Sequence, residues 1–129
     1  MKFPFGELHM GDSEHIEWVK SQCDPELWHV AAIAVLVYLD DARGFLVWLF
    51  DQPEVDRATA GYVFLGAHGH EYLRGQTEFH GEGLSGKRWL SAMGAICRRA
   101  ATAGFANDAL GLDAGFDPSG YRPMRPRAT

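Results

Sequence analysis

The sequence has little of what defines several common classes of protein. Its 129 residues contain two cysteines, Cys23 and Cys97, and no Cys-x-x-Cys pair, which excludes a disulfide-rich framework and predicts a reduced protein. The longest apolar run, residues 30–39, is far shorter than the ~20 residues that span a bilayer. The first residues also lack the apolar stretch of a secretory signal. We therefore expect a cytoplasmic location and no membrane partner.

Motifs for covalent and nucleotide chemistry are missing as well. Leu84-Ser85-Gly86 does not form the Gly-x-Ser-x-Gly turn of a serine hydrolase, and neither cysteine lies beside a histidine. Lys87 follows a glycine-rich stretch, but the spacing is not that of a phosphate-binding loop. A chain of this size can bury enough surface to fold without a metal or disulfide. We predict no catalytic residues and no cofactor.

The charge that is present is unevenly distributed. Hydrophobic residues make up 47% and charged residues 22% of the chain, as in an ordinary globular domain, and the formal net charge is -5. Residues 1–86 hold 5 basic and 14 acidic residues, whereas residues 87–129 hold 7 and 3. An acidic protein is weakly attracted to phosphate backbones, so nucleic acid is not an expected partner. The first part of the chain can instead offer an acidic surface to a basic protein.

Two helix-start signals lie near the N-terminus. Gly11-Asp12-Ser13 precedes apolar residues at helical spacing, which predicts a first short helix. Asp24-Pro25-Glu26 then supplies a capping side chain, a proline at the first helical position and an acidic residue in the first turn. Residues 27–38 are apolar on almost all sides and rich in β-branched residues, so a buried strand is the alternative to a second helix. The cap and the length favour the helix.

Aspartates mark the next two predicted helices. Asp40-Asp41 interrupts the apolar run and can cap a third helix over residues 42–50, and Asp56 opens a fourth. Asp24 and Asp56 are therefore interpreted as helix caps. Asp40-Asp41 is also compatible with a pair of carboxylates for acid–base chemistry, because neighbouring like charges separate their pKa values. Capping is the favoured interpretation, because adjacent side chains at a helix entrance point in different directions.

The second half of the chain combines a glycine-rich stretch with one strong helix. Six glycines in residues 66–86 predict a loop. Ser85 can cap the last helix, whose outer face is expected to carry Lys87, Arg88, Arg98 and Arg99. We predict one all-α domain over residues 1–129, a compact antiparallel bundle of about five helices. It divides into a helical core (12–67), a glycine-rich loop (68–84), the last helix (85–103) and an irregular tail (104–129).

Part of the chain carries the residue pattern of a known family. The matching residues are Asp40-Asp41, Trp48, Pro53, Asp56, Thr59-Ala60 and Val63-Phe64, together with the later Phe116-Asp117-Pro118. Residues 26–65 thereby resemble the bacterial family known as domain of unknown function four-two-seven-four. That family has Asn-Trp where this chain has Tyr38-Leu39, and Gly where it has Ala42. The resemblance implies a small, mainly helical domain and brings no set of catalytic residues.

Aromatic residues beside acidic ones suggest a partner-binding surface. Such rings either fill a core or anchor an interface. The candidate residues are Glu14, Glu17, Trp18, Asp24, Glu26 and Trp28. They predict a protein-binding module, most concretely an immunity-type protein that neutralises a toxin with a basic surface. Two alternatives stay open: the rings close an edge of the core, or they are buried in a homodimer.

The glycine-rich stretch offers a candidate from another class. His68 and His70 in a His-x-His pair, together with His80, could supply three ligands to zinc. Glu71 or Glu82 would then activate water, which makes a small metal-dependent hydrolase the alternative function. A glycine-rich loop positions side chains poorly unless the metal itself orders it, so a solvated polar loop is the simpler interpretation.

Overall fold

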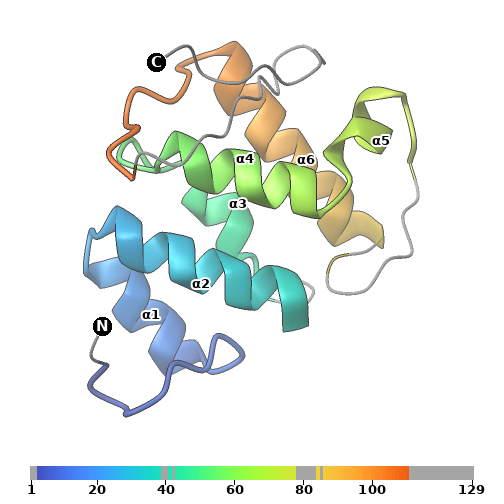
Figure 1. The fold of residues 1–129 in the computed structure, drawn as a ribbon. Coiled ribbons are helices and arrows are strands. Elements are labelled where there is room, and N and C mark those ends of the chain that lie inside the picture. Colours follow the sequence, from blue (N-terminus) through green and yellow to red (C-terminus); the bar gives the residue numbers. More distant parts are fainter. Residues whose placement is uncertain (1–2, 39–40, 42, 78–83, 85, 111–129) are drawn as a thin grey trace.

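All regular secondary structure in the described part of the chain is helical. The computed structural model describes residues 3–38, 41, 43–77, 84 and 86–110 (Figure 1). Within these residues there are six helices and no strand: α1 (Ser13–Ser21), α2 (Pro25–Tyr38), α3 (Phe45–Leu49), α4 (Arg57–Gly66), α5 (Gly69–Leu73) and α6 (Gly86–Ala101). The predicted all-α class is confirmed. No helix in this part of the chain has the length and apolar character needed to cross a bilayer.

The first two helices begin where the sequence predicts. A carboxylate oxygen of Asp12 accepts the N–H of Glu14 at 2.8 Å, which satisfies one of the unpaired donors at the start of α1. Asp24 does the same for α2 through the N–H of Glu26 at 3.1 Å, with Pro25 at the first helical position. Residues 27–38 are helical, so the β-branched residues do not produce a strand.

The third helix is shorter than predicted because of one glycine. Gly44 has φ +70° and directly precedes Phe45, so the chain enters α3 from the left-handed region and not from a preceding helical turn. Asp41 accepts the N–H of Leu46 at 3.0 Å, which confirms that it serves the start of this helix. The predicted range of 42–50 is therefore wrong at its beginning, and Asp40 lies outside the described residues.

The two central helices lie side by side and run in the same direction. His29 Nδ1 is 2.8 Å from Thr59 Oγ1, and seven residues later a Cβ on Gly66 would lie 3.0 Å from the Leu36 side chain. The residue numbers of both contacting pairs differ by 30, so the two helices advance together. They are therefore parallel, as Figure 1 also shows. The predicted antiparallel arrangement is wrong for this pair. The segment with α3 brings the chain back to the level of the start of α2 before α4 begins.

The last long helix does pack antiparallel to α4. At the start of α6, the Trp89 indole N–H donates to the Ala67 carbonyl oxygen, at the end of α4, at 2.7 Å. Beyond the end of α6, the Asn107 carbonyl oxygen accepts the N–H of Arg57 at 2.8 Å. Residues 104–110 are irregular, as predicted, but they are hydrogen-bonded to the start of α4: the Arg57 guanidinium donates to the Phe105 carbonyl oxygen at 3.3 Å, and the Leu110 N–H donates to Asp56 at 3.0 Å. Ser85 and the remaining tail lie outside the described residues.

A short helix replaces part of the predicted glycine-rich loop. α5 follows α4 almost directly, and a Cβ on Gly69 would clash with the Phe64 ring. Glycine therefore permits close packing at this position instead of ending the regular structure. The prediction of a loop over 68–84 is wrong for residues 69–73, and residues 78–83 lie outside the described part of the chain.

Candidate functional site: the acidic surface of α1 and α2

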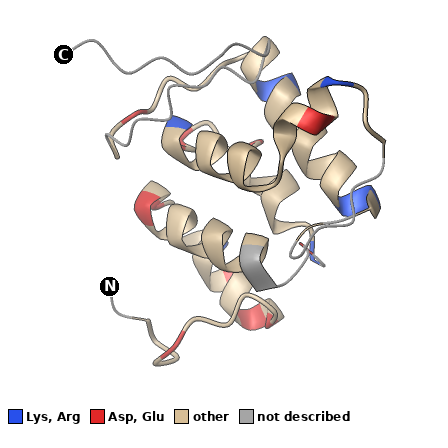
Figure 2. Cartoon of the chain, turned by 45° about the vertical axis from the view of Figure 1, so that its right-hand side comes forward, with Lys and Arg blue, Asp and Glu red and all other residues tan. Residues whose placement is uncertain are grey.

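Four predicted site residues are exposed in the N-terminal part of the chain, two in the first half of α1 and two beyond its end. Glu14 and Glu17 lie on α1, and Asp24 and Glu26 lie at the start of α2; all four are exposed. We call these four residues the acidic surface. Figure 2 shows acidic residues around α1 and the start of α2, whereas basic residues lie near both ends of α6 and on several other elements. The charge difference between the two parts of the sequence is therefore also a difference between two regions of the fold.

Few positive charges neutralise this surface. Residues 3–38 contain six Asp or Glu residues and a single Lys or Arg, Lys20. Lys20 Nζ lies 3.8 Å from a Glu17 carboxylate oxygen and also 5.3 Å from the centre of the Trp48 ring. An exposed pair of this length contributes at most about 1 kcal/mol to stability. The region therefore keeps a net negative charge that a basic partner can approach.

The helix ends explain why the carboxylates lie here. Asp24 accepts the N–H groups of Glu26 and Leu27 at 3.1 and 3.4 Å, so its carboxylate is held at the start of α2. Glu14 and Glu26 lie in the first turns of α1 and α2, where the helix dipole favours negative charge. Three of the four acidic residues thus lie at helix N-termini, where only the Asp24 carboxylate is held by hydrogen bonds that the structure shows, and Glu17 follows Glu14 by about one turn.

The two tryptophans of the predicted surface have different environments. Trp28 is 2% exposed, and its indole N–H donates to the Val19 carbonyl oxygen at 3.0 Å. The prediction that the Trp28 ring contacts a partner is wrong, because the ring fills the core between α1 and α2. Trp18 is half-buried, with the rings of Phe3 and Phe5 each 5.9 Å away and edge-on to it. Of the two tryptophans, Trp18 alone can add aromatic area to the acidic surface.

The predicted histidine site cannot be assembled from the described residues. The rings of His68 and His70 lie 5.7 Å apart, and His70 Nε2 is 3.3 Å from a Glu71 carboxylate oxygen. His80 and Glu82 lie outside the described residues. In the part of the chain that is described, no three His, Cys, Asp or Glu side chains are grouped so that they could hold a metal ion.

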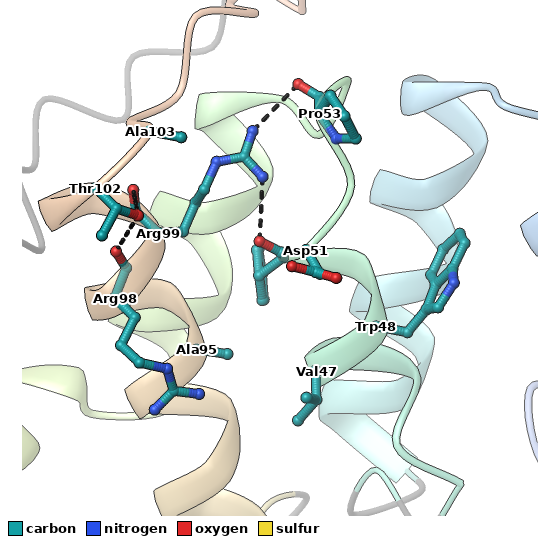
Figure 3. Close-up of a pocket in the computed structure, with 10 residues that line it drawn as sticks. Val47, Trp48, Asp51, Pro53, Ala95, Arg98, Arg99, Thr102 and Ala103 are labelled. Carbon is teal, nitrogen blue, oxygen red and sulfur yellow. Dashed lines mark hydrogen bonds between the residues drawn. The ribbon is translucent and has the colours of Figure 1, made fainter.

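A groove that the sequence analysis did not identify lies between α3 and the end of α6 (Figure 3). It has a volume of about 510 Å³, with Val47 on α3 and Arg98 on α6 at its two walls. Asp51 contributes a carboxylate. The ten lining residues include no histidine, serine or cysteine; the polar side chains that they supply are those of Asp51, Arg98, Arg99 and Thr102.

Arg99, which also lines this groove, has a structural role. Its guanidinium donates to four carbonyl oxygens at distances of 2.7 to 3.2 Å: those of Phe50, Gln52, Pro53 and Gly104. These bonds attach the α3–α4 connection to the end of α6. Arg99 is half-buried, so the expectation that it belongs to an exposed outer face is wrong, whereas Arg98 is exposed as expected. Helical periodicity could not distinguish the two, because the acceptors come from a distant part of the chain.

Asp41 lines a second, smaller cavity of about 330 Å³ together with Met10, Ile16, Val35 and Phe45. Burial raises the pKa of its carboxyl to about 6, against three backbone N–H groups and Arg88, which favour the charged form. Since Asp40 is not described, no pair of carboxylates can be assigned. The hydrogen bond to Leu46 supports the capping interpretation, as does the bond from Ala58 N–H to Asp56 at 2.8 Å.

Comparison of the chain with protein-family models, with curated proteins and with solved structures gives no match. The resemblance to the bacterial family therefore stays a prediction. Of the residues that carry it, Asp41, Asp56 and Thr59 are buried and hydrogen-bonded within the fold. Their roles in this structure are to start α3, to start α4 and to join α4 to α2.

Proposed function

We propose that this domain binds a basic protein through its acidic surface, most concretely as an immunity-type protein that neutralises a toxin with a positively charged surface. The observation that carries the proposal is the exposure of Glu14, Glu17, Asp24 and Glu26 in a region with one lysine. Complementary charge steers two proteins together and raises the association rate constant. Trp18 would supply aromatic contact area beside the carboxylates.

A co-expression experiment tests the immunity function. The product of the neighbouring reading frame is expressed in a host cell alone and together with this domain. We expect the neighbour alone to stop growth and co-expression to restore it. If the neighbour is harmless, and the two purified proteins do not associate at about 1 to 10 µM, a range that includes weak but specific complexes, the immunity function is wrong.

Charge reversal tests whether the acidic surface makes the contact. Glu14→Lys should lower the association rate constant about tenfold at low ionic strength, and the effect should shrink as salt is added. Glu54→Lys is the matched control, because Glu54 is also exposed but lies in the connection between α3 and α4. Equal effects of the two substitutions would show that net charge matters and that the acidic surface does not.

A further inference from the structure

Two hydrogen-bond donors converge above one glycine of α6. A Cβ on Gly94 would lie 3.0 Å from the Nη1 atom of Arg98 and 3.2 Å from the hydroxyl oxygen of Tyr72. Arg98 follows Gly94 by about one turn of α6, whereas Tyr72 belongs to α5. The two side chains therefore approach the same point from two different helices.

Packing fixes the position of Tyr72, and Gly94 makes room for Arg98. The Tyr72 ring lies edge-on to the ring of Trp89, with the two centres 5.9 Å apart. Trp89 is fully buried and donates its indole N–H to the Ala67 carbonyl oxygen at 2.7 Å. Because Gly94 has no side chain, the Arg98 guanidinium can lie close against α6. Groups that are positioned before a ligand arrives lose less conformational entropy when it binds.

No acceptor in the described part of the chain satisfies these two donors. The Arg98 guanidinium forms no hydrogen bond or ion pair with any described residue, and the Tyr72 hydroxyl forms no hydrogen bond with one. Every buried polar side-chain atom in this part of the chain has a hydrogen-bond partner, so solvent must reach the unpaired Tyr72 hydroxyl. Arg98 is exposed. Both donors are therefore accessible to a ligand that accepts hydrogen bonds.

The charges around this point favour an anion. The Glu71 carboxylate, on the same helix as Tyr72, lies 3.8 Å from Arg74 Nη1, which partly balances its charge. Lys87 lies on the same side of α6 as Gly94, because seven residues make about two turns. The net charge of the whole chain is -5, but charges more than about 8 Å away are largely screened at physiological ionic strength. The nearby groups therefore decide, and their balance is positive.

We propose that Arg98 and Tyr72 bind a phosphate group above Gly94, either inorganic phosphate or the phosphate of a monoester. An oxygen atom just outside the point that a Cβ would occupy lies about 3 Å from both donors, which is hydrogen-bonding distance. The guanidinium of arginine is always charged and offers several N–H groups to phosphate oxygens. A carboxylate usually takes both of its bonds from one arginine. Donors on two helices suit the tetrahedral oxygens of phosphate better.

The phosphate site is separate from the acidic surface. Its donors lie on α5 and α6, whereas the acidic surface lies on α1 and the start of α2 (Figure 1). Glu14→Lys, which tests partner binding, should therefore leave phosphate binding unchanged. The two proposals can fail independently of each other.

An NMR titration of the full chain with inorganic phosphate tests the proposal, at a constant ionic strength of about 0.15 M. We expect the amide signal of Gly94 to shift saturably, with a dissociation constant of about 1 to 10 mM, as suits a few contacts at an accessible site. Phenyl phosphate distinguishes the two sources: it should bind at least as tightly if the ligand is a monoester, and about tenfold more weakly if the site takes free phosphate. Acetate should bind at least about tenfold more weakly than phosphate.

Three substitutions separate the site from a general effect of charge. Tyr72→Phe keeps the ring and the net charge but removes the hydroxyl, so it should raise the dissociation constant about tenfold. Arg98→Gln should raise it at least as much, because it removes the charged donor. Lys87→Gln is the matched control: it removes the same charge about two turns away, and should leave the constant within about twofold.

Gly94→Ala separates ligand binding from a structural role. The added Cβ would occupy the space between the two donors, so phosphate binding should be lost. The unfolding temperature should stay the same or rise, because alanine favours a helix more than glycine does and the end of the Arg98 side chain can move. No saturable shift of Gly94 up to about 50 mM phosphate would overturn the proposal. Unchanged binding in Tyr72→Phe, equal effects of Arg98→Gln and Lys87→Gln, or equal binding of acetate and phosphate would overturn it as well.

Discussion

Helices α2 and α6 have similar lengths but very different relations to solvent. α6 is amphipathic: Trp89, Met93 and Ile96 are buried, whereas Lys87 and Arg98 are exposed. α2 has no such division, because both its buried residues and exposed Val30 are apolar. The residue pattern of α6 therefore predicts which side of the helix faces the core, and the pattern of α2 does not. An all-apolar helix indicates burial, but not what buries each side.

Removing the largest buried side chain of α6 should have the strongest effect on stability. Trp89 is fully buried, and its indole N–H donates to the Ala67 carbonyl oxygen. Trp89→Ala removes this bond and leaves a cavity, so the free energy of unfolding should fall by about 3 to 5 kcal/mol. Urea denaturation measures it, with Ser91→Ala on the exposed side of α6 as the control. Similar losses in both variants would mean that α6 is not packed as described.

The next effect concerns the connection between α2 and α3. Since burial raises the pKa of the Asp41 carboxyl to about 6 from 3.8, the folded protein binds this proton more tightly than the unfolded chain. Asp41 therefore lowers the free energy of unfolding as the pH rises from about 4 to above 6. At 1.36 kcal/mol per pKa unit, Asp41→Asn should raise that free energy by up to about 3 kcal/mol at pH 8, because an amide oxygen can still accept the Leu46 N–H.

Denaturation curves at pH 4 and pH 8 separate this contribution from a general packing effect. The difference between Asp41→Asn and the wild type should be large at pH 8 and small at pH 4. A difference that does not change with pH would show that the Asp41 carboxyl ionises normally. The left-handed backbone at this position, with φ +50°, is well suited to asparagine.

His29 should give a smaller pH dependence of the opposite sign. Desolvation between α2 and α4 lowers its pKa, and the charge of Asp56 opposes this only in part. The unfolded chain therefore binds the proton more tightly, so His29 lowers the free energy of unfolding as the pH falls below about 6.5. His29→Gln should reduce this loss while keeping a hydrogen-bonding group near Thr59. Chemical denaturation at pH 7 and pH 5 measures the effect, and an unchanged loss in the variant would contradict it.

The smallest expected effect sharpens the contrast between the two sides of α2. Val30→Gln should change the free energy of unfolding of the monomer by less than about 0.5 kcal/mol, because the exposed residue has few partners to lose. Leu27→Gln, one turn earlier on the buried side, would place an amide in the core and cost several times more. Unfolding curves at several protein concentrations distinguish an effect on folding from an effect on self-association. A large loss for Val30→Gln in dilute solution would show that this side is covered within the chain.

Local signals were sufficient for most helix positions. The sequence predicts helix starts at Asp12, Asp24 and Asp56, and each of these side chains accepts a backbone N–H within the first turn. Local signals failed at Gly44 and Gly69, where glycine shortens one helix and allows another. At Gly44 the outcome depends on a left-handed backbone, and at Gly69 on how closely the chain approaches the Phe64 ring; the presence of a glycine does not by itself indicate either.

In the candidate site too, some features follow from the local sequence and others from tertiary packing. The four carboxylates are exposed because charged groups are costly to bury, and the sequence alone determines this. The burial of Trp28, the bonds that hold Arg99 and the parallel packing of α2 and α4 were decided by tertiary structure. Composition and spacing specify which side chains avoid water and where helices begin. Only the packed chain specifies which apolar side finds a neighbour, because that neighbour lies far away in the sequence.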